Sequence, residues 1–179
     1  MLVPAVTIGA FAAGELVQAL RRRPGATRAD VRSETAFRLV FFAGILMLPL
    51  SRAVVPGAVV HAVAIGFVLA WLGLLLRWWS FLTLGRYFTV VVMTSEDQPV
   101  VDRGPYRFVR HPSYTALLLI FTGIGLMLQN WLGTVAAVTL VLIALLHRIR
   151  IEERALTAAL GEHYRTFAAT RARLIPYVW

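Results

Sequence analysis

Long apolar stretches separated by short polar segments dominate the chain. They cover Leu2–Leu20, Phe37–Val55, Ala58–Trp79, Tyr114–Leu128 and Leu132–His147. Most of them approach the roughly 20 residues that an α-helix needs to cross about 30 Å of hydrocarbon. The fourth is the shortest and is expected to form a helical hairpin with the fifth through a turn at Gln129 and Asn130. The pattern predicts an all-α, polytopic membrane protein with about five transmembrane helices in a single domain, residues 1–179.

Composition supports this fold class. Hydrophobic residues make up 59% of the 179 residues and charged residues only 15%, whereas roughly a quarter of the residues are charged in a typical soluble domain. The chain has no cysteine, which excludes disulfides, thiolate metal ligands and a cysteine nucleophile, and its four histidines lack the spacing of a zinc site. We therefore expect no metal. A P-loop, a dinucleotide fingerprint and a HExxH motif are also missing from the sequence.

The basic residues predict the orientation. All 18 are arginines, and 17 of them lie in segments that five helices place on one side of the membrane, while Arg52 lies on the other. By the positive-inside rule, the N-terminus is outside, and both the 80–112 segment and the C-terminal segment are cytoplasmic, at the inner membrane if the cell is prokaryotic. Anionic membrane lipids then explain the net charge of +9 better than nucleic acid does. The 80–112 segment is expected to form an ordered, folded-back loop at the interface.

The stretch GPYRFVRHPSY, residues 104–114, places arginines, a histidine and tyrosines directly before an apolar helix. Pro112 suits the first turn of that helix, where its missing N–H costs nothing, and His111 lies at the cap. The amides of the next three residues then carry partial positive charge beside Arg107 and Arg110. This arrangement predicts a corner that receives anions, with a simple helix cap as the alternative.

A second polar cluster follows the fifth apolar stretch. The helix is expected to continue to about Ala159, so that the adjacent Glu152 and Glu153 lie about 100° apart around it. They therefore should not serve one function together. Glu152 can pair with Arg148, four residues earlier, which leaves Glu153 on a different face. A surface salt bridge explains one of them, whereas carboxylates at this point would also suit the hydroxyls or cationic centre of a cofactor. Tyr164 belongs to an aromatic edge further along.

Two charged residues lie within apolar stretches. Glu15 is about two turns from Arg21 and can reach the interface, although an acidic residue inside a membrane is by default a site candidate. Arg77, at the end of the third stretch, is expected to join the cytoplasmic site.

The stretches LGRYFT, VVDRGPYRFVRHPSYTA and EERALTAALGEHYRTFAATRARLIP together resemble the isoprenylcysteine carboxyl methyltransferase family of integral membrane proteins and its relatives, the phospholipid N-methyltransferases. The resemblance covers about Arg77–Pro176, the motif-bearing core, and the first two stretches match only as hydrophobic helices. Two positions depart from the family pattern. Ala116 stands where many members have glycine, which is expected to narrow the pocket, and Phe167 stands where tyrosine is common, which removes one hydroxyl.

The resemblance implies a methyltransferase, most simply a carboxyl O-methyltransferase, that holds S-adenosyl-L-methionine at the cytoplasmic face between the loop and the C-terminal helix. A lipophilic or prenylated acceptor would enter from the bilayer. Arg107 or Arg110 would hold an acceptor carboxylate, and His111 would be the first base for an amine or thiol acceptor. The expected cofactor contacts are Tyr106, His111, Pro112, Tyr114, Glu152, Glu153 and Tyr164.

Two alternatives stay open. A similar C-terminal pattern, IPY followed by an aromatic residue, occurs in membrane sterol reductases that use NADPH. A non-catalytic membrane scaffold is compatible with the same helices. The acceptor, the methylated atom (O, N or S), the oligomeric state and the choice between Glu152 and Glu153 as cofactor contact are left open by these patterns.

Overall fold

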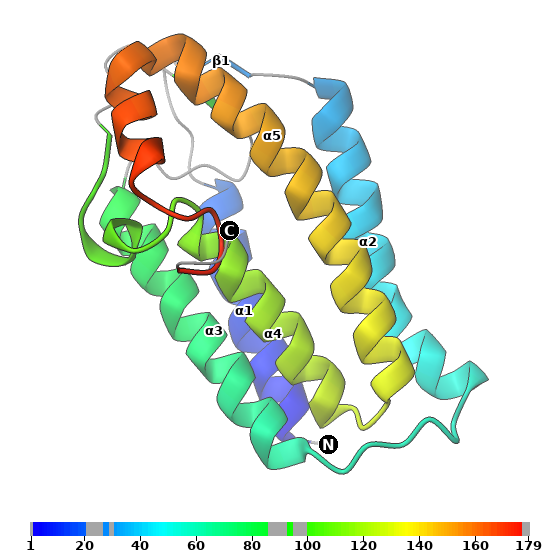
Figure 1. Ribbon diagram of the computed structural model, residues 1–179. Helices are drawn as coiled ribbons and strands as arrows, with labels where there is room; N and C mark the ends of the chain where they lie inside the picture. The colour runs from blue at the N-terminus through cyan, green and yellow to red at the C-terminus, as the bar shows by residue number, and fades with distance from the viewer. Residues whose placement is uncertain (1, 21–26, 29–30, 86–92, 95–99, 177–179) are drawn as a thin grey trace.

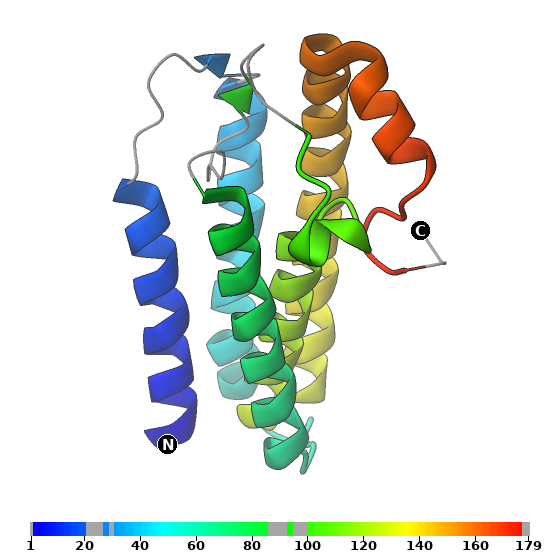
Figure 2. The same ribbon diagram turned by 90° about the vertical axis from the view of Figure 1, so that its left-hand side faces the viewer.

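The computed structural model describes every residue except 1, 21–26, 29–30, 86–92, 95–99 and 177–179. Its long helices run alternately up and down in Figures 1 and 2: α1 (Leu2–Leu20), α2 (Val31–Val54), α3 (Val63–Leu84), α4 (Pro112–Met127) and α5 (Trp131–Ala169). By length and composition α2, α3 and α5 can cross a membrane, and α1 and α4 are shorter apolar helices. The expected all-α organisation is confirmed, and so is the fourth stretch as the shortest helix, with 16 residues.

Helix boundaries differ from the expected ones mainly around the α2–α3 connection. The structure begins α3 at Val63 and not at residue 58, because Pro56 and Gly57 interrupt the helix. The backbone that follows pairs instead with the α4–α5 turn, where the Trp131 amide donates to the Ala58 carbonyl at 3.0 Å. The turn itself is the expected hairpin, because the Asn130 side chain caps α5 by accepting a hydrogen bond from the amide of Gly133 at 2.8 Å.

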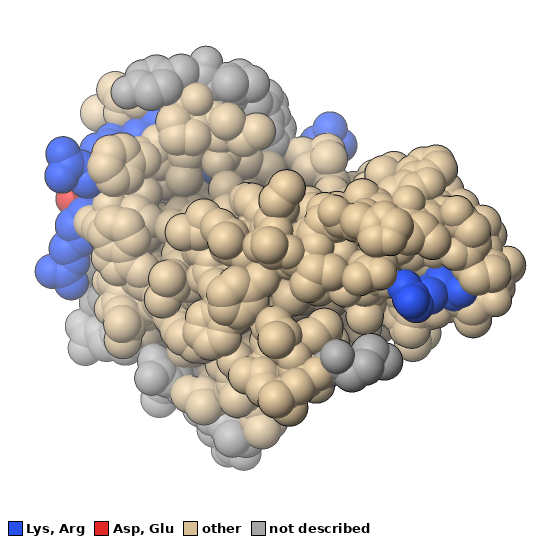
Figure 3. All heavy atoms as spheres, turned by 90° about the horizontal axis from the view of Figure 1, so that it is seen from below, with Lys and Arg blue, Asp and Glu red and all other residues tan. Residues whose placement is uncertain are grey.

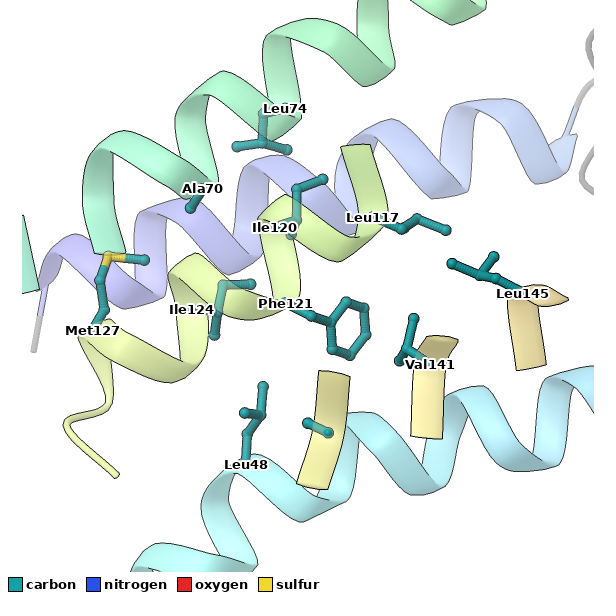
Figure 4. Packing of buried hydrophobic residues seen from close by; sticks show 11 residues of the cluster. Leu48, Ala70, Leu74, Leu117, Ile120, Phe121, Ile124, Met127, Val141 and Leu145 are labelled. Atoms are coloured by element: carbon teal, nitrogen blue, oxygen red, sulfur yellow. The ribbon is translucent and has the colours of Figure 1, made fainter. Parts of the chain in front are cut away.

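Buried side chains of α2, α3, α4 and α5 meet in one core (Figure 4). Ile120 points from α4 toward Leu74 of α3, while Phe121 points toward Val141 of α5. The backbones of α3 and α4 approach very closely, since a Cβ atom added at Gly123 would lie 2.4 Å from the amide nitrogen of Ala70. Small residues permit such an approach between membrane helices, and it holds the C-terminal half of α4 against α3.

The outside of the helices is apolar. On α2, for example, Leu39, Phe42 and Leu46 are 67%, 58% and 62% exposed, as expected for side chains that face lipid. The lower end of the molecule, which carries the α2–α3 and α4–α5 connections, is dominated by uncharged atoms in Figure 3. The protein is therefore an integral membrane protein, and the helix order brings the ends of α1, α3 and the straight part of α5 and the start of α2 toward its upper end (Figure 1).

Helix α5 bends sharply close to the residue where its end was expected, and a second helical part follows the bend. It continues past Ala159 to Leu160, and Gly161 then adopts φ 55° and ψ −129°, a conformation that essentially only glycine tolerates. The second part of the helix therefore turns back toward the start of α4 (Figure 1). In the 80–112 segment, the structure describes a two-residue strand β2 (Met93–Thr94), paired antiparallel with β1 (Thr27–Arg28), and a 3-10 helix η2 (Gly104–Arg107). The expected SEDQP turn lies outside the described residues.

Candidate functional site

The C-terminal tail, residues 170–176, runs over the segment that precedes α4. We call residues 110–114 the RHPSY corner. Two hydrogen bonds join tail and corner: the Arg110 amide donates to the Ala172 carbonyl at 2.8 Å, and the His111 amide donates to the Arg173 carbonyl at 2.9 Å. Just after the corner, the Thr115 hydroxyl donates to the Leu174 carbonyl at 2.7 Å. The bend at Gly161 makes this contact possible, since a straight α5 would carry the tail away from α4.

The corner does not present the free amides that its position at a helix start suggests. The amides of Tyr114 and Thr115 both donate to the His111 carbonyl, at 3.0 and 3.2 Å. The expectation that these two amides receive an anion is therefore wrong. An anion held here would contact side chains or the amide of Ser113 instead.

A stacked pair of rings forms the centre of the site. The imidazole of His111 and the phenol of Tyr114 lie one helical turn apart, with centroids 5.4 Å apart and planes 8° from parallel. Pro112 begins α4 between them and is fully buried. His111 Nε2 is 3.2 Å from Glu153 Oε1, and the Tyr114 hydroxyl donates to Glu152 at 2.6 Å. Glu152 also lies 3.9 Å from His111 Nδ1. The two adjacent glutamates therefore meet at one pair of rings, contrary to the expectation that they should not serve one function together.

Glu153 forms ion pairs with residues of both the RHPSY corner and the C-terminal tail. Besides His111, it pairs with Arg110 at 2.7 Å and with Arg173 of the tail at 3.0 Å. It lies beyond the roughly 20 residues of α5 that cross the hydrocarbon. Although burial raises the pKa of Glu153, the hydrogen bond from His111 and the charges of His111 and Arg110 outweigh it and leave the pKa below its ordinary value. Glu153 is therefore ionised at neutral pH and ties corner, helix and tail together.

Tyr114 also connects the site to α2. Arg148 Nε donates to the Tyr114 hydroxyl at 2.8 Å, and the Arg148 guanidinium lies 4.5 Å from the ring centroid of Phe37. The tyrosine hydroxyl therefore stands between an arginine and the Glu152 carboxylate, in a relay that fixes its orientation. Tyr114 thus links Arg148 to Glu152, and the expected direct pairing of these two residues stays a prediction.

A second charged cluster lies deeper, between α1, α3 and α4. Arg77 of α3 donates to Glu15 of α1 at 2.5 and 2.9 Å, and to the carbonyl and hydroxyl oxygens of Ser113 at 2.9 and 2.6 Å. Arg77 thus joins the site, as the sequence predicts. Glu15, which was expected at the interface, is its partner within the helices.

Tyr106 lies close to both clusters, whereas Arg107 does not. Tyr106 is 7% exposed. Burial raises the pKa of its phenol well above the ordinary value, and the nearby Glu152 carboxylate raises it further, so the hydroxyl stays protonated. Arg107 is exposed, and its guanidinium lies 5.1 Å from the ring centroid of Phe108. The structure therefore gives no support to Arg107 as a site residue.

Two polar atoms at the site are buried without a hydrogen-bond partner among the described residues. They are Arg110 Nε and the Tyr164 hydroxyl. Tyr164 is only 5% exposed and packs against Phe167, although Arg110 is near enough for its charge to act on the phenol. A buried polar atom without a hydrogen-bond partner destabilises the folded protein. These two atoms therefore mark positions where polar groups of a ligand would fit.

The two departures noted in the sequence lie at helix contacts. Ala116 is fully buried, and its carbonyl oxygen would be 2.8 Å from a Cβ atom added at Gly73 of α3. Ala116 therefore lies at the α3–α4 contact, and the expected narrowing of the pocket stays a prediction. Phe167 is buried beneath the guanidinium of Arg171, which lies 4.6 Å from its ring centroid.

Sequence reasoning missed Arg173 and the role of Arg148. Arg173 contacts Glu153, 20 positions away, and Arg148 contacts Tyr114, 34 positions away. The contact made by Arg173 also depends on the bend in α5. Gly161, which lies within an otherwise continuous helical pattern, was the one local signal that could have indicated that bend.

Comparisons with known proteins point to one family. The model of the isoprenylcysteine carboxyl methyltransferase family matches residues 64–158. Protein-S-isoprenylcysteine O-methyltransferase A of Arabidopsis thaliana is 32% identical over 115 residues, and a probable protein-S-isoprenylcysteine O-methyltransferase of Oryza sativa subsp. indica is 33% identical over 116. These matches cover 63% and 64% of this chain and 58% and 61% of the relatives, so the chain spans about three-fifths of their length.

A solved structure shares the fold. It is that of the eukaryotic intramembrane Ras methyltransferase, an isoprenylcysteine carboxyl methyltransferase, without a monobody. It superimposes with a TM-score of 0.66 and 26% sequence identity, over 80% of this chain and 53% of the other.

Proposed function

The chain belongs to the isoprenylcysteine carboxyl methyltransferase family, and from this premise we propose that it transfers a methyl group from S-adenosylmethionine to the carboxylate of a lipophilic acceptor at the cytoplasmic membrane face. The observation that carries the proposal is the stacked His111–Tyr114 pair, held by Glu152 and Glu153. We propose that residues 1–179 act as one methyltransferase domain, with the site in its core at about 77–176.

The site's donors and acceptors fit S-adenosylmethionine in kind. That molecule carries a sulfonium and an ammonium cation, a carboxylate, ribose hydroxyls and an adenine ring. Glu152, the more exposed glutamate, suits the hydroxyls or the ammonium group. Arg110 and Tyr164 each have a buried polar atom without a partner among the described residues, and these suit the carboxylate. The aromatic faces of Tyr106 and Tyr114 suit the sulfonium or the adenine.

The chemistry asks for positioning more than for proton transfer. When bound, the cofactor would supply a methyl group on a cationic sulfur, which would keep the electron pair of the S–CH₃ bond when an acceptor carboxylate takes the methyl group. No proton moves, so His111 is not needed as a base. The stack of His111 on Tyr114 and its contact with Glu153 instead hold the site rigid. Rigid alignment of methyl donor and acceptor, with water excluded, accounts for much of the rate of methyl transfer.

The proposed acceptor is an isoprenylcysteine-like carboxylate or another membrane-partitioned acid. The relatives' names mention isoprenylcysteine, and a prenyl chain can lie in the bilayer against the apolar helices while its carboxylate reaches the cytoplasmic face. The comparisons give no support to an NADPH-dependent reductase or to a scaffold.

Ligand-dependent thermal unfolding of the detergent-purified protein tests the cofactor. A ligand that binds only the folded state raises the unfolding temperature with its concentration. S-adenosylhomocysteine is expected to stabilise the protein and NADPH is not. A shift with NADPH alone would favour the reductase, and no shift with either would favour the scaffold.

Transfer of labelled methyl groups tests the reaction. Membranes that contain the protein are incubated with methyl-labelled S-adenosylmethionine and lipophilic acids. A methyl ester releases labelled methanol in base, whereas N-methyl and S-methyl products keep their label. Base-stable label alone would contradict carboxyl methylation.

A further inference from the structure

The arginines expected to hold the acceptor carboxylate are poorly placed for that role. Arg107 is exposed and turned onto Phe108, and Arg110 is paired with Glu153. A third guanidinium, that of Arg77, lies on the membrane side of the corner. It is on α3, seven residues before its end at Leu84, or about two helical turns.

Arg77 presents the two-pronged face that recognises a carboxylate. Its side chain is 7% exposed, and its Nε and Nη2 atoms donate to the two oxygens of Glu15. This fork geometry matches any carboxylate. Two further contacts hold the guanidinium independently of Glu15: Nη1 donates to Ser113, and the group lies 4.9 Å from the ring centroid of Phe81.

Glu15 is the more weakly held partner of the pair. It belongs to α1, which packs against α3 far less extensively than α4 does, and its side chain is 27% exposed. Helix α1 also lies outside the region that matches the family, whereas Arg77 and Ser113 lie within it. The guanidinium thus belongs to the shared core, and the carboxylate that it binds comes from a peripheral helix.

The Arg77 face is adjacent to the proposed cofactor site. Ser113, to which it donates, stands between His111 and Tyr114 in the RHPSY corner. We propose that Arg77 is the anchor for the carboxylate of the lipophilic acceptor, and that Glu15 occupies this anchor until the acceptor displaces it. The exchange replaces one carboxylate by another, so the buried guanidinium is never left without a counter-charge. The inference rests on the proposed function and names the side chain that selects its substrate class.

Binding of an acid and of its neutral analogue tests the anchor. The probes are an N-acetylated S-prenylcysteine and the corresponding carboxamide, measured on the purified full chain with S-adenosylhomocysteine present. The unaltered protein is expected to prefer the acid. Arg77→Lys, which keeps the charge but loses the fork, is expected to reduce that preference at least tenfold. Glu15→Gln removes the competing carboxylate and is expected to bind the acid severalfold more tightly, with carboxamide binding unchanged.

The controls separate this inference from the proposed function. Glu162→Gln alters an exposed glutamate that is also paired with an arginine, Arg165, and is expected to change neither preference nor affinity. S-adenosylhomocysteine affinity should stay unchanged in all variants. If the unaltered protein binds no S-adenosylhomocysteine and methylates no acid, the proposed function fails.

Two results would overturn the anchor while that function stands. One is an Arg77→Lys variant that keeps the preference for the acid. The other is a Glu15→Gln variant that loses acid binding, which would make the pair a structural clamp. If either variant fails to fold, Glu15→Asp decides: its shorter carboxylate should also raise acid affinity, and unchanged affinity refutes displacement.

Discussion

Glu152 and Glu153 are neighbours in the sequence, but their surroundings assign them different tasks. Both oxygens of Glu153 are engaged by cationic groups or histidine, from Arg110, His111 and Arg173. Glu152 accepts a hydrogen bond from the Tyr114 hydroxyl and lies 3.9 Å from His111 Nδ1, and its side chain is 29% exposed against 14% for Glu153. The Glu153 carboxylate therefore holds parts of the protein together, whereas the Glu152 carboxylate still has room to contact a ligand.

Substitution of each glutamate by glutamine should separate these tasks. Glu152→Gln is expected to lower S-adenosylhomocysteine affinity about ten- to a hundredfold with little loss of stability, because one charge-assisted hydrogen bond is worth roughly 1.5–3 kcal/mol. Glu153→Gln is expected to destabilise the fold and release the tail. Calorimetric binding and thermal unfolding measure the two effects, and equal effects of both changes would refute the assignment.

The pH dependence of stability gives a further test of the Glu153→Gln variant. Since folding lowers the pKa of Glu153 below its ordinary value of 4.5, its stabilising contribution is complete above that value and is lost as the pH falls through the folded-state pKa. The stability difference between the unaltered protein and Glu153→Gln should therefore shrink on acidification. A difference that persists undiminished at acid pH would mean that the carboxylate charge is not what stabilises the fold.

At the scale of elements, the bend in α5 decides whether the site exists. The C-terminal tail supplies backbone carbonyls to Arg110 and His111 only because Gly161 reverses the direction of the helix. The space around Gly161 is open, since a Cβ atom added there meets nothing within 4 Å. Any effect of substitution at this position is therefore conformational and not steric.

Gly161→Ala should straighten the helix and undock the tail. An L-residue at φ 55° and ψ −129° carries a strain of about 1–3 kcal/mol, which favours continued helix. We expect unchanged or slightly greater helical content by circular dichroism, faster proteolysis after residue 161, and weaker S-adenosylhomocysteine binding. Gly9→Ala is the matched control, because Gly9 also has open space but lies within regular helix. A protected tail with full affinity would contradict this role of the bend.

The elements also show which features a sequence can indicate. Apolar stretches near 20 residues reveal the helices, and Pro112 and Asn130 mark two helix starts through local chemistry. Which helices pack against each other is not determined by the local sequence. Nothing in the pattern around Glu15 specifies Arg77, because their contact depends on how α1 packs beside α3. The RHPSY corner and the two glutamates were identified from sequence because the motif itself carries them, whereas Arg173 needed the bend.

For the whole molecule, the distribution of charge agrees with an asymmetric membrane protein. Of the arginines in the described part of the chain, those on the polar side of the predicted topology lie toward the upper end, where the site lies, and Arg52 lies near the other end. Arg52 donates to the carbonyl of Leu128 at 2.5 Å, so it satisfies the C-terminus of α4 and complements the negative end of its dipole. The one arginine outside the pattern therefore has a local structural role. The other arginines remain consistent with the positive-inside rule.

The orientation of the molecule can be tested directly because the chain has no cysteine. Gly57→Cys introduces one thiol at the lower end, at an exposed position with open space, and Glu162→Cys introduces one near the site, where the glutamate side chain is 78% exposed. In intact cells, a membrane-impermeant thiol reagent is expected to label Gly57→Cys, and to label Glu162→Cys only after the membrane is permeabilised. The unaltered chain gives the background for both. Labelling of both variants in intact cells would contradict an odd number of crossings between the two positions. The reverse pattern would place the site outside, where the cytoplasmic cofactor does not reach it, and would overturn the proposed sidedness together with the function that depends on it.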